Sequence, residues 1–394
     1  MITETTSALA EYWTRAIERR ATPLDLALDG VEWWTAMLDR RKPDWTSPND
    51  VVIVSDFAAL RDFSDGSRST VVPTVVLPPQ AGHHSCIVDY SRDQSQIQTI
   101  RAAGLERVYA LEWIGATAET RNTTIGDYVD FLERAIDATG GGPVNLIGDC
   151  QGGWLAAIYA ALHPEQVNTL TLAGAPIDFH AGDGVIAAWV RALCRTGDLS
   201  FYEAIVASSG GVMPGQRILE GFSAIKPENE VEKQLGLLAA LDDPKHRERY
   251  AEFEDWFKWT QDLPGRFYLW VVGELFRSNK LIAGDLWVKG RQVDLSELSM
   301  PLYLLAGETD HITPPPQVFA AAEAVSTPAR DVVKRTTSGG HLGLFMGREA
   351  LRDHWPPILA DVLDHSRERA PKAKAERKAR AKTPTRGRRT IPAP

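Results

Sequence analysis

Apolar residues recur along this chain with two different periods. Within residues 7–41 they recur every three or four positions, which predicts two amphipathic helices separated at Pro23. Farther along, short runs rich in Val, Ile and Leu predict buried strands, and helical patterns separate most of them. The predicted strands are residues 51–54, 70–77, 107–111, 144–147, 167–174, 301–307 and 331–335, with a turn at Asp65-Gly66 and helices over 93–103, 125–138 and 154–162. This alternation predicts a mostly parallel, doubly wound α/β sheet with its site at the carboxyl ends of the strands.

The alternation stops between Ala175 and about Gly290, where the pattern is irregular, helical and rich in aromatic residues. An insertion at this point predicts a helical cap over the site. The underside of a cap must pack on something, so we expect Trp189 and Trp256 to help line an apolar substrate pocket. The predicted organisation is therefore N-terminal amphipathic helices (1–45), the first part of the sheet domain (46–175), the cap (176–290), the second part of the sheet domain (291–365) and a tail (366–394).

Composition narrows the class of protein. The chain holds only three cysteines, Cys86, Cys150 and Cys194, which is too few for a disulfide framework and suits a reducing compartment. Its start lacks the basic and apolar regions of a signal peptide, and no apolar run approaches the roughly 20 residues that span a bilayer. These features predict a soluble, cytoplasmic protein without a transmembrane segment.

The charge of the chain is unevenly distributed. Residues 367–394 contain eleven Lys or Arg and two Glu, so this segment carries +9 and, because the whole chain carries −9, the rest carries −18. The segment has no apolar periodicity that could supply a core, and we expect it to be disordered. Two interpretations of the tail stay open: it binds an anionic surface or nucleic acid, or it only keeps the protein in solution.

A candidate nucleophile lies between the strand at 144–147 and the helix at 154–162. The pentapeptide there, residues 148–152, reads Gly-Asp-Cys-Gln-Gly, a G-x-C-x-G pattern at a strand-to-helix turn. In such a nucleophile elbow the flanking glycines let the turn close tightly and expose the central side chain, here Cys150. The helix N-terminus favours a thiolate and a developing oxyanion. The alternative is a buried structural cysteine in an ordinary turn.

An acid and a histidine follow in the order that a catalytic triad needs. Asp310 lies just after the strand at 301–307, and His341 lies in the loop after the strand at 331–335. Nucleophile, then acid, then histidine is the chain order of the α/β-hydrolase fold, whose cap is inserted between strands 6 and 7. In this reading His341 takes the thiol proton of Cys150, and Asp310 orients the imidazole and stabilises its charged form.

Other residues compete for these roles. Glu308 lies two positions before Asp310, and Asp331 and Asp353 lie near the histidine in the sequence. His311 is adjacent to the acid and is predicted to be structural. The remaining histidines show no partner pattern; among them are His83, His84, His163 and His180.

The oxyanion hole is expected to use backbone N–H groups from two loops. The residue after the nucleophile, Gln151, would supply one. The loop Pro78–Gly82 follows an early strand, where this fold places the second donor, so we expect Gln80 or Ala81 to supply it.

These stretches resemble the polyhydroxyalkanoate synthase family, especially its short catalytic subunits that work with a helper subunit. The resemblance covers roughly residues 77–363. Its most specific motifs are Gly148-Asp149-Cys150-Gln151-Gly152-Gly153, Asp310-His311-Ile312-Thr313-Pro314-Pro315 and Gly340-His341-Leu342-Gly343. It implies that Cys150 carries the acyl group, with Asp310 as acid and His341 as base. It also implies a 3-hydroxyacyl-CoA substrate, a polyester product, a helper subunit or homodimer, and a location at polyester granules. No metal or resident cofactor is implied, since coenzyme A arrives as part of the substrate.

Departures from this family leave the direction of the reaction open. Trp154 stands where a small residue is expected and could narrow the mouth of the substrate site. Residues 341–347 and 267–269 also resemble intracellular polyhydroxyalkanoate depolymerases, which use a cysteine triad as well. Three functions therefore stay open: a synthase-like acyltransferase, a depolymerase or thioesterase, and a granule-binding protein on a hydrolase fold.

Overall fold

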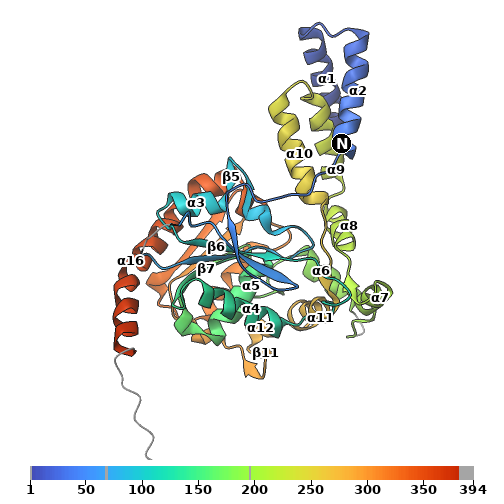
Figure 1. Cartoon of the computed structure of the whole chain (residues 1–394). Coiled ribbons are helices and arrows are strands. Elements are labelled where there is room, and N and C mark those ends of the chain that lie inside the picture. The colour runs from blue at the N-terminus through green and yellow to red at the C-terminus, as the bar shows by residue number, and fades with distance from the viewer. Residues whose placement is uncertain (1, 67–69, 195–196, 381–394) are drawn as a thin grey trace, which may run out of the picture.

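An eight-stranded sheet forms the centre of the protein (Figure 1). The structure, a computed structural model, describes residues 2–66, 70–194 and 197–380 of the chain. The strands of the sheet lie in the order β1-β2-β6-β3-β7-β8-β13-β14. Their bounds are β1 Asp50–Val54, β2 Ala58–Asp62, β3 Thr74–Leu77, β6 Val108–Trp113, β7 Val144–Asp149, β8 Val167–Ala173, β13 Leu302–Gly307 and β14 Val332–Thr337.

The strand order identifies the fold. Strand β2 runs antiparallel to both of its neighbours, and every other pair in the sheet is parallel. When the strands of this sheet are counted along the chain, their spatial order is first, second, fourth, third, fifth, sixth, seventh, eighth. This is the arrangement of the α/β-hydrolase fold, so the predicted fold class is confirmed.

Helices cover both faces of the sheet, which explains why its central strands are buried on both sides. Every residue of β3, β7, β8 and β13 is buried, as expected for parallel strands that are covered on both sides. The covering helices are α3 Gln96–Ala102, α4 Ile125–Ala138, α5 Gln151–Leu162, α13 Pro315–Phe319, α14 Ala321–Ala324, α15 Gly343–Met346 and α16 Trp355–Arg380. Helix α4 begins at a capping box between Thr124 and Asp127.

The early strands differ from the prediction. Strand β2 was missed, because its sequence Ala-Ala-Leu-Arg-Asp has weak strand propensity and depends on pairing with β1 and β6. Strand β3 begins at Thr74 rather than at residue 70. Asp65 and Gly66 do form a turn with positive φ, but this turn lies between β2 and β3.

A helical segment separates β8 from β13, which are the sixth and seventh strands of the sheet, as the predicted fold requires. Its helices are α6 Val185–Leu193, α7 Ser200–Ser208, α8 Gly215–Ile225, α9 Glu228–Ala239, α10 Pro244–Lys258, α11 Gly265–Trp270 and α12 Lys280–Ala283. Two short strands, β9 (Val212–Met213) and β10 (Leu263–Pro264), pair within it. Outside it, β4 (Asp89–Ser91) pairs with β5 (Gln94–Ser95), and β11 (Trp287–Val288) pairs with β12 (Arg291–Gln292).

The N-terminal helices, α1 (Ile2–Glu18) and α2 (Pro23–Leu38), form a hairpin that stands away from the sheet (Figure 1). The hairpin packs on α9 and α10 of the cap. The indole Nε1 of Trp33 donates to the carbonyl of Gln234 in α9 at 3.1 Å, which links the hairpin directly to the cap.

The last helix corrects one expectation. Helix α16 continues to Arg380, whereas disorder was predicted from residue 366. The segment is rich in Ala, Lys, Arg and Glu, all strong helix formers, so its composition is compatible with a helix. Residues 381–394 of the predicted tail lie outside the described residues. Among the described helices, none combines the length and apolarity needed to cross a bilayer.

Candidate active site

Cys150 occupies the turn between β7 and α5 with an unusual backbone conformation. Its φ is +50° and its ψ is −115°, a conformation that non-glycine residues rarely adopt. Its N–H donates to the carbonyl of Ala173 at 2.8 Å, which ties the turn to β8. Such strain at the head of a helix is the geometry of a nucleophile elbow.

The glycines of the elbow are required by close packing. A Cβ added to Gly152 would lie 2.0 Å from the carbonyl oxygen of Leu77. One added to Gly153 would lie 2.2 Å from the Cβ of Ala175, and one added to Gly148 would lie 2.4 Å from the Cα of Gly153. The helix therefore starts in direct contact with the ends of its neighbouring strands, and only glycine permits this approach.

His341 and Asp310 meet at the carboxyl ends of β13 and β14. The Nδ1 atom of His341 lies 2.7 Å from Oδ2 of Asp310. The other oxygen, Oδ1, accepts hydrogen bonds from the backbone N–H groups of Ile312 at 2.9 Å and Thr313 at 2.8 Å. Both Asp310 oxygens are thus occupied, and the carboxylate is held against the ring.

The electrostatic environment favours a charged ring at His341. Burial of the ring by itself lowers the pKa of His341, but the charge of Asp310 and the interaction with Cys150 outweigh it. The pKa of His341 therefore lies well above its ordinary value. This interaction brings the three predicted triad residues, Cys150, Asp310 and His341, into one electrostatic group, and it is the arrangement in which an imidazole holds a thiol proton.

The competing acids lie elsewhere. Glu308 is exposed, and its backbone N–H donates to the carbonyl of Thr337. Asp331 pairs with Arg330 at 3.6 Å, and Asp353 pairs with Arg352 at 2.7 Å. Of these four acids, Asp310 is the one whose carboxylate contacts His341, so it remains the candidate acid.

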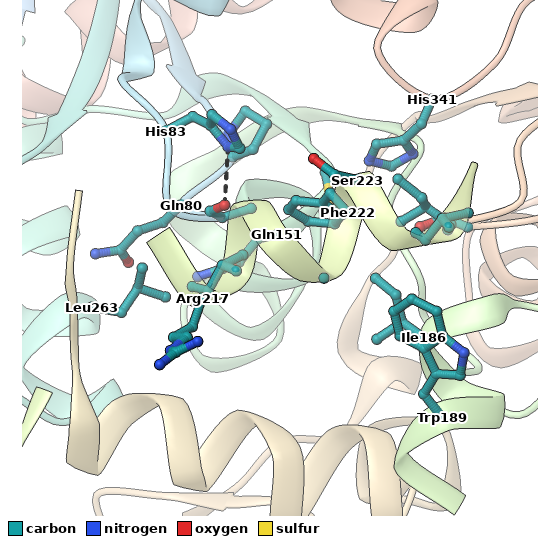
Figure 2. A pocket seen from close by; sticks show the side chains of 18 of the residues that line it. Gln80, His83, Gln151, Ile186, Trp189, Arg217, Phe222, Ser223, Leu263 and His341 are labelled. Atoms are coloured by element: carbon teal, nitrogen blue, oxygen red, sulfur yellow. Dashed lines mark hydrogen bonds between the residues drawn. The ribbon is translucent and has the colours of Figure 1, made fainter. Parts of the chain in front are cut away.

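A cavity of about 1100 Å³ lies above the elbow and beneath the cap. Cys150, Gln151 and His341 line its floor, and the loop residues Gln80 and Ala81 line it as well. As the first residue of α5, Gln151 has an N–H that no helical carbonyl can satisfy, so this group is available to a developing oxyanion. Figure 2 labels Gln151, His83 and His341 among the side chains that line this cavity.

The three tryptophans predicted to bind substrate all line this cavity, but they differ in exposure. Trp189 of α6 is exposed and points into the cavity (Figure 2). Trp154 is buried beside Phe267, and the buried indole of Trp256 donates to the carbonyl of His84 at 2.9 Å. Trp154 and Trp256 are therefore fixed parts of the cavity wall that also belong to the protein core. Of the three tryptophans, only the exposed Trp189 has room to change its side-chain conformation when a ligand binds.

The structure also places His83 in the cavity wall, where the sequence showed no partner for it. Its ring stacks on Trp256 and Phe257, with ring centroids 4.9 and 5.4 Å apart. Nδ1 of His83 lies 3.1 Å from the carbonyl of Ala81, and burial lowers the pKa of His83 to about 4. The neighbouring His84 pairs with Glu112 at 3.3 Å. The only available sequence signal was the position of both residues directly after the loop Pro78–Gly82.

A buried carboxyl group lies next to the nucleophile in the sequence. Burial raises the pKa of Asp149 to about 8, against the opposing effects of a hydrogen bond from Gln96 and the charge of His341. Gln96 Nε2 donates to Oδ1 of Asp149 at 3.2 Å. No grouping of three or more His, Cys, Asp or Glu suited to a metal ion occurs within residues 2–66, 70–194 and 197–380.

Comparisons with known proteins agree with this architecture. A family model described as "Protein of unknown function (DUF3141)" matches residues 57–361. The poly(3-hydroxyalkanoate) polymerase subunit PhaC of Haloferax mediterranei is 28% identical over 319 residues, which cover 79% of this chain and 63% of that subunit. The PhaC subunit of Allochromatium vinosum is 28% identical over 278 residues, which cover 69% of this chain and 75% of that subunit. These relatives confirm the resemblance to polyhydroxyalkanoate synthases, although the chain matches less than two thirds of the Haloferax subunit.

A solved structure with a similar chain path is a carboxylesterase of Nitrososphaera gargenis. It is 18% identical, with a TM-score of 0.49, and the match covers 80% of this chain and 99% of that chain. The strand order of the sheet identifies the fold independently of this likeness.

Proposed function

The chain belongs to the DUF3141 family, and from its site we propose that it is an acyltransferase of the polyhydroxyalkanoate synthase type. In this proposal it polymerises 3-hydroxyacyl groups from coenzyme A thioesters through a thioester on Cys150. The observation that carries the proposal is a cysteine at a strained strand-to-helix turn, beside a His341–Asp310 pair, on the floor of an apolar cavity. The proposed substrate class rests on the names of the PhaC relatives, which describe poly(3-hydroxyalkanoate) polymerase subunits.

The first step transfers the acyl group to the enzyme. His341 Nε2 takes the proton of the Cys150 thiol, and the thiolate attacks the thioester carbonyl of the substrate. The N–H of Gln151 and an N–H of the loop at Gln80-Ala81 stabilise the oxyanion that forms. When the carbon–sulfur bond to coenzyme A breaks, His341 returns the proton to the leaving thiolate. Free coenzyme A and an acyl-Cys150 thioester result, so one thioester replaces another at little free-energy cost.

The second step forms the ester bond. The hydroxyl group of another 3-hydroxyacyl unit gives its proton to His341 and attacks the acyl-Cys150 carbonyl. The carbon–sulfur bond to Cys150 breaks, and the sulfur takes the proton back from His341. The product is an ester one unit longer, with Cys150 ready for another cycle. Asp310 keeps Nδ1 of the ring occupied throughout, so that Nε2 alone exchanges protons.

The cavity supports an acyl substrate larger than a small metabolite. Its volume of about 1100 Å³ slightly exceeds the range of roughly 300–1,000 Å³ that is typical of pockets for drug-sized ligands. Aliphatic and aromatic side chains dominate the cap side of its lining; those shown in Figure 2 include Ile186, Trp189, Phe222 and Leu263. Such a lining stabilises an apolar acyl chain and excludes water from the acyl-enzyme.

The remaining parts of the proposal concern where the protein works and with what. We place the enzyme at polyester granules, because a growing chain bound to Cys150 would keep it there. A helper subunit or a second copy of the chain is the expected protein partner. The basic segment after residue 366 is proposed to hold an anionic surface or nucleic acid.

The test is incubation of the full-length protein with 3-hydroxybutyryl-CoA and, separately, 3-hydroxyoctanoyl-CoA. The release of the coenzyme A thiol is measured with a thiol-reactive colorimetric reagent, and the acyl product is identified by chromatography. Thiol release with polymer supports the acyltransferase, whereas thiol release with free hydroxy acid assigns the site to a thioesterase. Cys150→Ala should release no thiol, and Cys86→Ala, at a buried cysteine that is not part of the elbow sequence, is the matched control. Absence of thiol release from the unaltered protein with both substrates would contradict the proposal.

A further inference from the structure

The loop that follows β3 lines the cavity and is expected to supply the second oxyanion donor through Gln80 or Ala81. We call residues 78–83 the oxyanion loop. It contains no helix or strand, so its conformation depends on contacts with other segments of the chain. A backbone donor stabilises an oxyanion only at hydrogen-bond distance, so the groups that fix this loop bear directly on the rate of acyl transfer.

Two residues of the oxyanion loop are tied to distant parts of the chain. Nε2 of Gln80 donates to the hydroxyl of Tyr128 in α4 at 2.7 Å. The carbonyl of Gly82 accepts from the backbone N–H of Gln261, just beyond the end of α10, at 2.8 Å. Gly82 has a φ of +84°, and a Cβ added there would lie 3.3 Å from the Cβ of Ile218 in α8. The cap therefore packs directly on the loop.

His83 fixes the residue that lies between these two anchors, Ala81. Nδ1 of His83 lies 3.1 Å from the carbonyl oxygen of Ala81, and a dashed line at His83 marks this contact in Figure 2. Burial lowers the pKa of His83 to about 4, so the ring is neutral at pH 7 and has a single N–H. Because a carbonyl oxygen can only accept, this hydrogen lies on Nδ1. The peptide group that carries the Ala81 N–H thus lies between two fixed points, the side chain of Gln80 and the carbonyl of Ala81.

The cap, in turn, fixes the ring of His83. The ring stacks on Trp256 and Phe257 of α10, with 26° and 17° between the ring planes. Phe222 of α8 is a third aromatic neighbour, at a centroid distance of 6.1 Å. The backbone of His83 also forms an isolated antiparallel bridge with Thr260. The cap therefore holds the ring, and the ring holds the oxyanion loop.

These contacts make two different demands on the side chain at residue 83. Stacking needs a flat ring, which phenylalanine would also provide. The hydrogen bond to Ala81 needs a donor at the position of Nδ1, which phenylalanine lacks. Histidine meets both demands, although a buried imidazole destabilises the folded protein in weak acid. A position that served only for stacking would be filled better by phenylalanine, so the donor is the property that distinguishes His83.

We propose that His83 is a positioning residue for acyl transfer, which holds the oxyanion loop so that the N–H of Ala81 meets the oxyanion formed on the substrate. In this role His83 transfers no proton; proton transfer belongs to His341. Without the hydrogen bond from His83, the carbonyl of Ala81 can turn away and displace the neighbouring N–H, and a displacement of about 1 Å can slow a reaction by up to about 10²-fold. The proposal rests on the proposed function in one respect, namely that Cys150 attacks an acyl carbonyl.

Two reactions of Cys150 separate this role from a purely structural one. Acylation by p-nitrophenyl acetate passes through an oxyanion, whereas alkylation by iodoacetamide does not. The rate constants of both reactions are measured on the full-length protein, and the rates of Cys150→Ala are subtracted. His83→Phe keeps the stacked ring and loses the donor, so acylation should fall roughly 10- to 100-fold while alkylation stays within about twofold. An unchanged alkylation rate also shows that the variant has folded around Cys150.

Two further variants test the specificity of this effect. His83→Asn loses part of the stack but places an amide N–H donor where Nδ1 stands, so it should retain most of the acylation rate. His163→Phe is the matched control, because the ring of His163 also stacks on an aromatic ring, that of Tyr159 at 4.8 Å, but lies outside the cavity lining. This control should leave the ratio of acylation to alkylation unchanged.

Two results would overturn the proposal while the proposed function stands. The first is an unchanged ratio in His83→Phe. The second is an equal loss of acylation in His83→Phe and His83→Asn, which would assign the effect to packing of the ring rather than to its donor. An unaltered protein that is alkylated at Cys150 but not acylated there would instead contradict the acyl-enzyme of the proposed function, and the role of His83 with it.

Discussion

Oδ2 of Asp310 lies 2.7 Å from Nδ1 of His341, while Oδ1 of the same carboxylate accepts two backbone hydrogen bonds. The loop after β13 thus fixes the carboxylate, and the carboxylate fixes the ring in the loop after β14. The parallel pairing of these two strands, with Gly307 opposite Thr337 at their ends, brings the two loops together. Orientation of the ring therefore depends on a single acid.

We expect Asp310→Asn to lower turnover by on the order of 10²–10⁴-fold without unfolding the protein, because the imidazole loses the anion that orients it. Glu308→Gln, at an exposed residue that does not contact the ring, is the control and should retain most activity. Steady-state rates of thiol release measure both. A larger loss in Glu308→Gln than in Asp310→Asn would show that the acid is misassigned.

Brief exposure to substrate should acylate Cys150 and leave Cys86 and Cys194 unmodified. Cys86 is buried, and burial raises the pKa of its thiol, so its nucleophilic thiolate is scarce. Peptide mass spectrometry after rapid quenching locates the adduct. Cys150→Ser should leave little activity, because an alkoxide needs stronger base assistance than a thiolate. An equal adduct on Cys86 would refute the assignment.

His83 should make the protein less stable in weak acid. Burial lowers its folded-state pKa from 6.5 to about 4, so the folded protein keeps it neutral while the unfolded chain binds the proton. The contribution of this group to the free energy of unfolding is complete above pH 6.5 and falls by about 3 kcal/mol as the pH drops to about 4. Urea unfolding of the unaltered protein and of His83→Phe, compared at several pH values, measures this. Across that window the unaltered protein should lose stability relative to His83→Phe, and a constant difference between the two would contradict the prediction.

Gly152→Ala should severely destabilise the protein. The new methyl group would lie 2.0 Å from the carbonyl oxygen of Leu77, so the backbone of β3 or α5 must move. We expect a loss of about 3 kcal/mol or more in the free energy of unfolding, or failure to fold. Gly236→Ala in α9 is the control, since its Cβ would meet nothing within 4 Å; it should be neutral or stabilising by up to about 1 kcal/mol. Denaturant titration measures the free energy of unfolding of both variants. Equal changes in the two would contradict the close approach of Gly152 to Leu77.

Truncation after residue 366 should leave the rate of thiol release from a soluble substrate unchanged. If the basic segment binds an anionic partner, truncation should weaken that binding, most strongly at low salt, because such attraction is screened within about 10 Å at 0.1 M salt. Co-sedimentation of the two forms with duplex DNA and with anionic vesicles, across a salt series, measures the difference. Identical curves that do not vary with salt would leave the segment a role in solubility only.

The identities of the candidate catalytic groups could be predicted from the sequence, because each has a short local signature. The elbow around Cys150 depends on glycines within three residues, and Asp310 and His341 lie in the loops that follow β13 and β14. The alternation of strands and helices likewise predicted a mostly parallel sheet, whose central strands are buried throughout. Strand β2 was not predicted from the sequence, because its residues form a strand only by pairing with β1 and β6.

Only the tertiary structure decided which polar groups are buried and what they face. The sequence favoured Asp310 but left Glu308 as a competitor, and only the structure shows that Asp310 is buried against His341 whereas Glu308 is exposed. His83 looked unpartnered because the aromatic rings that stack on it belong to α10, far along the chain. Periodicity showed that α1 and α2 carry apolar faces, but not which side the cap would cover. Burial arises from contacts between distant segments, and a local pattern can show that a face needs a cover without identifying what covers it.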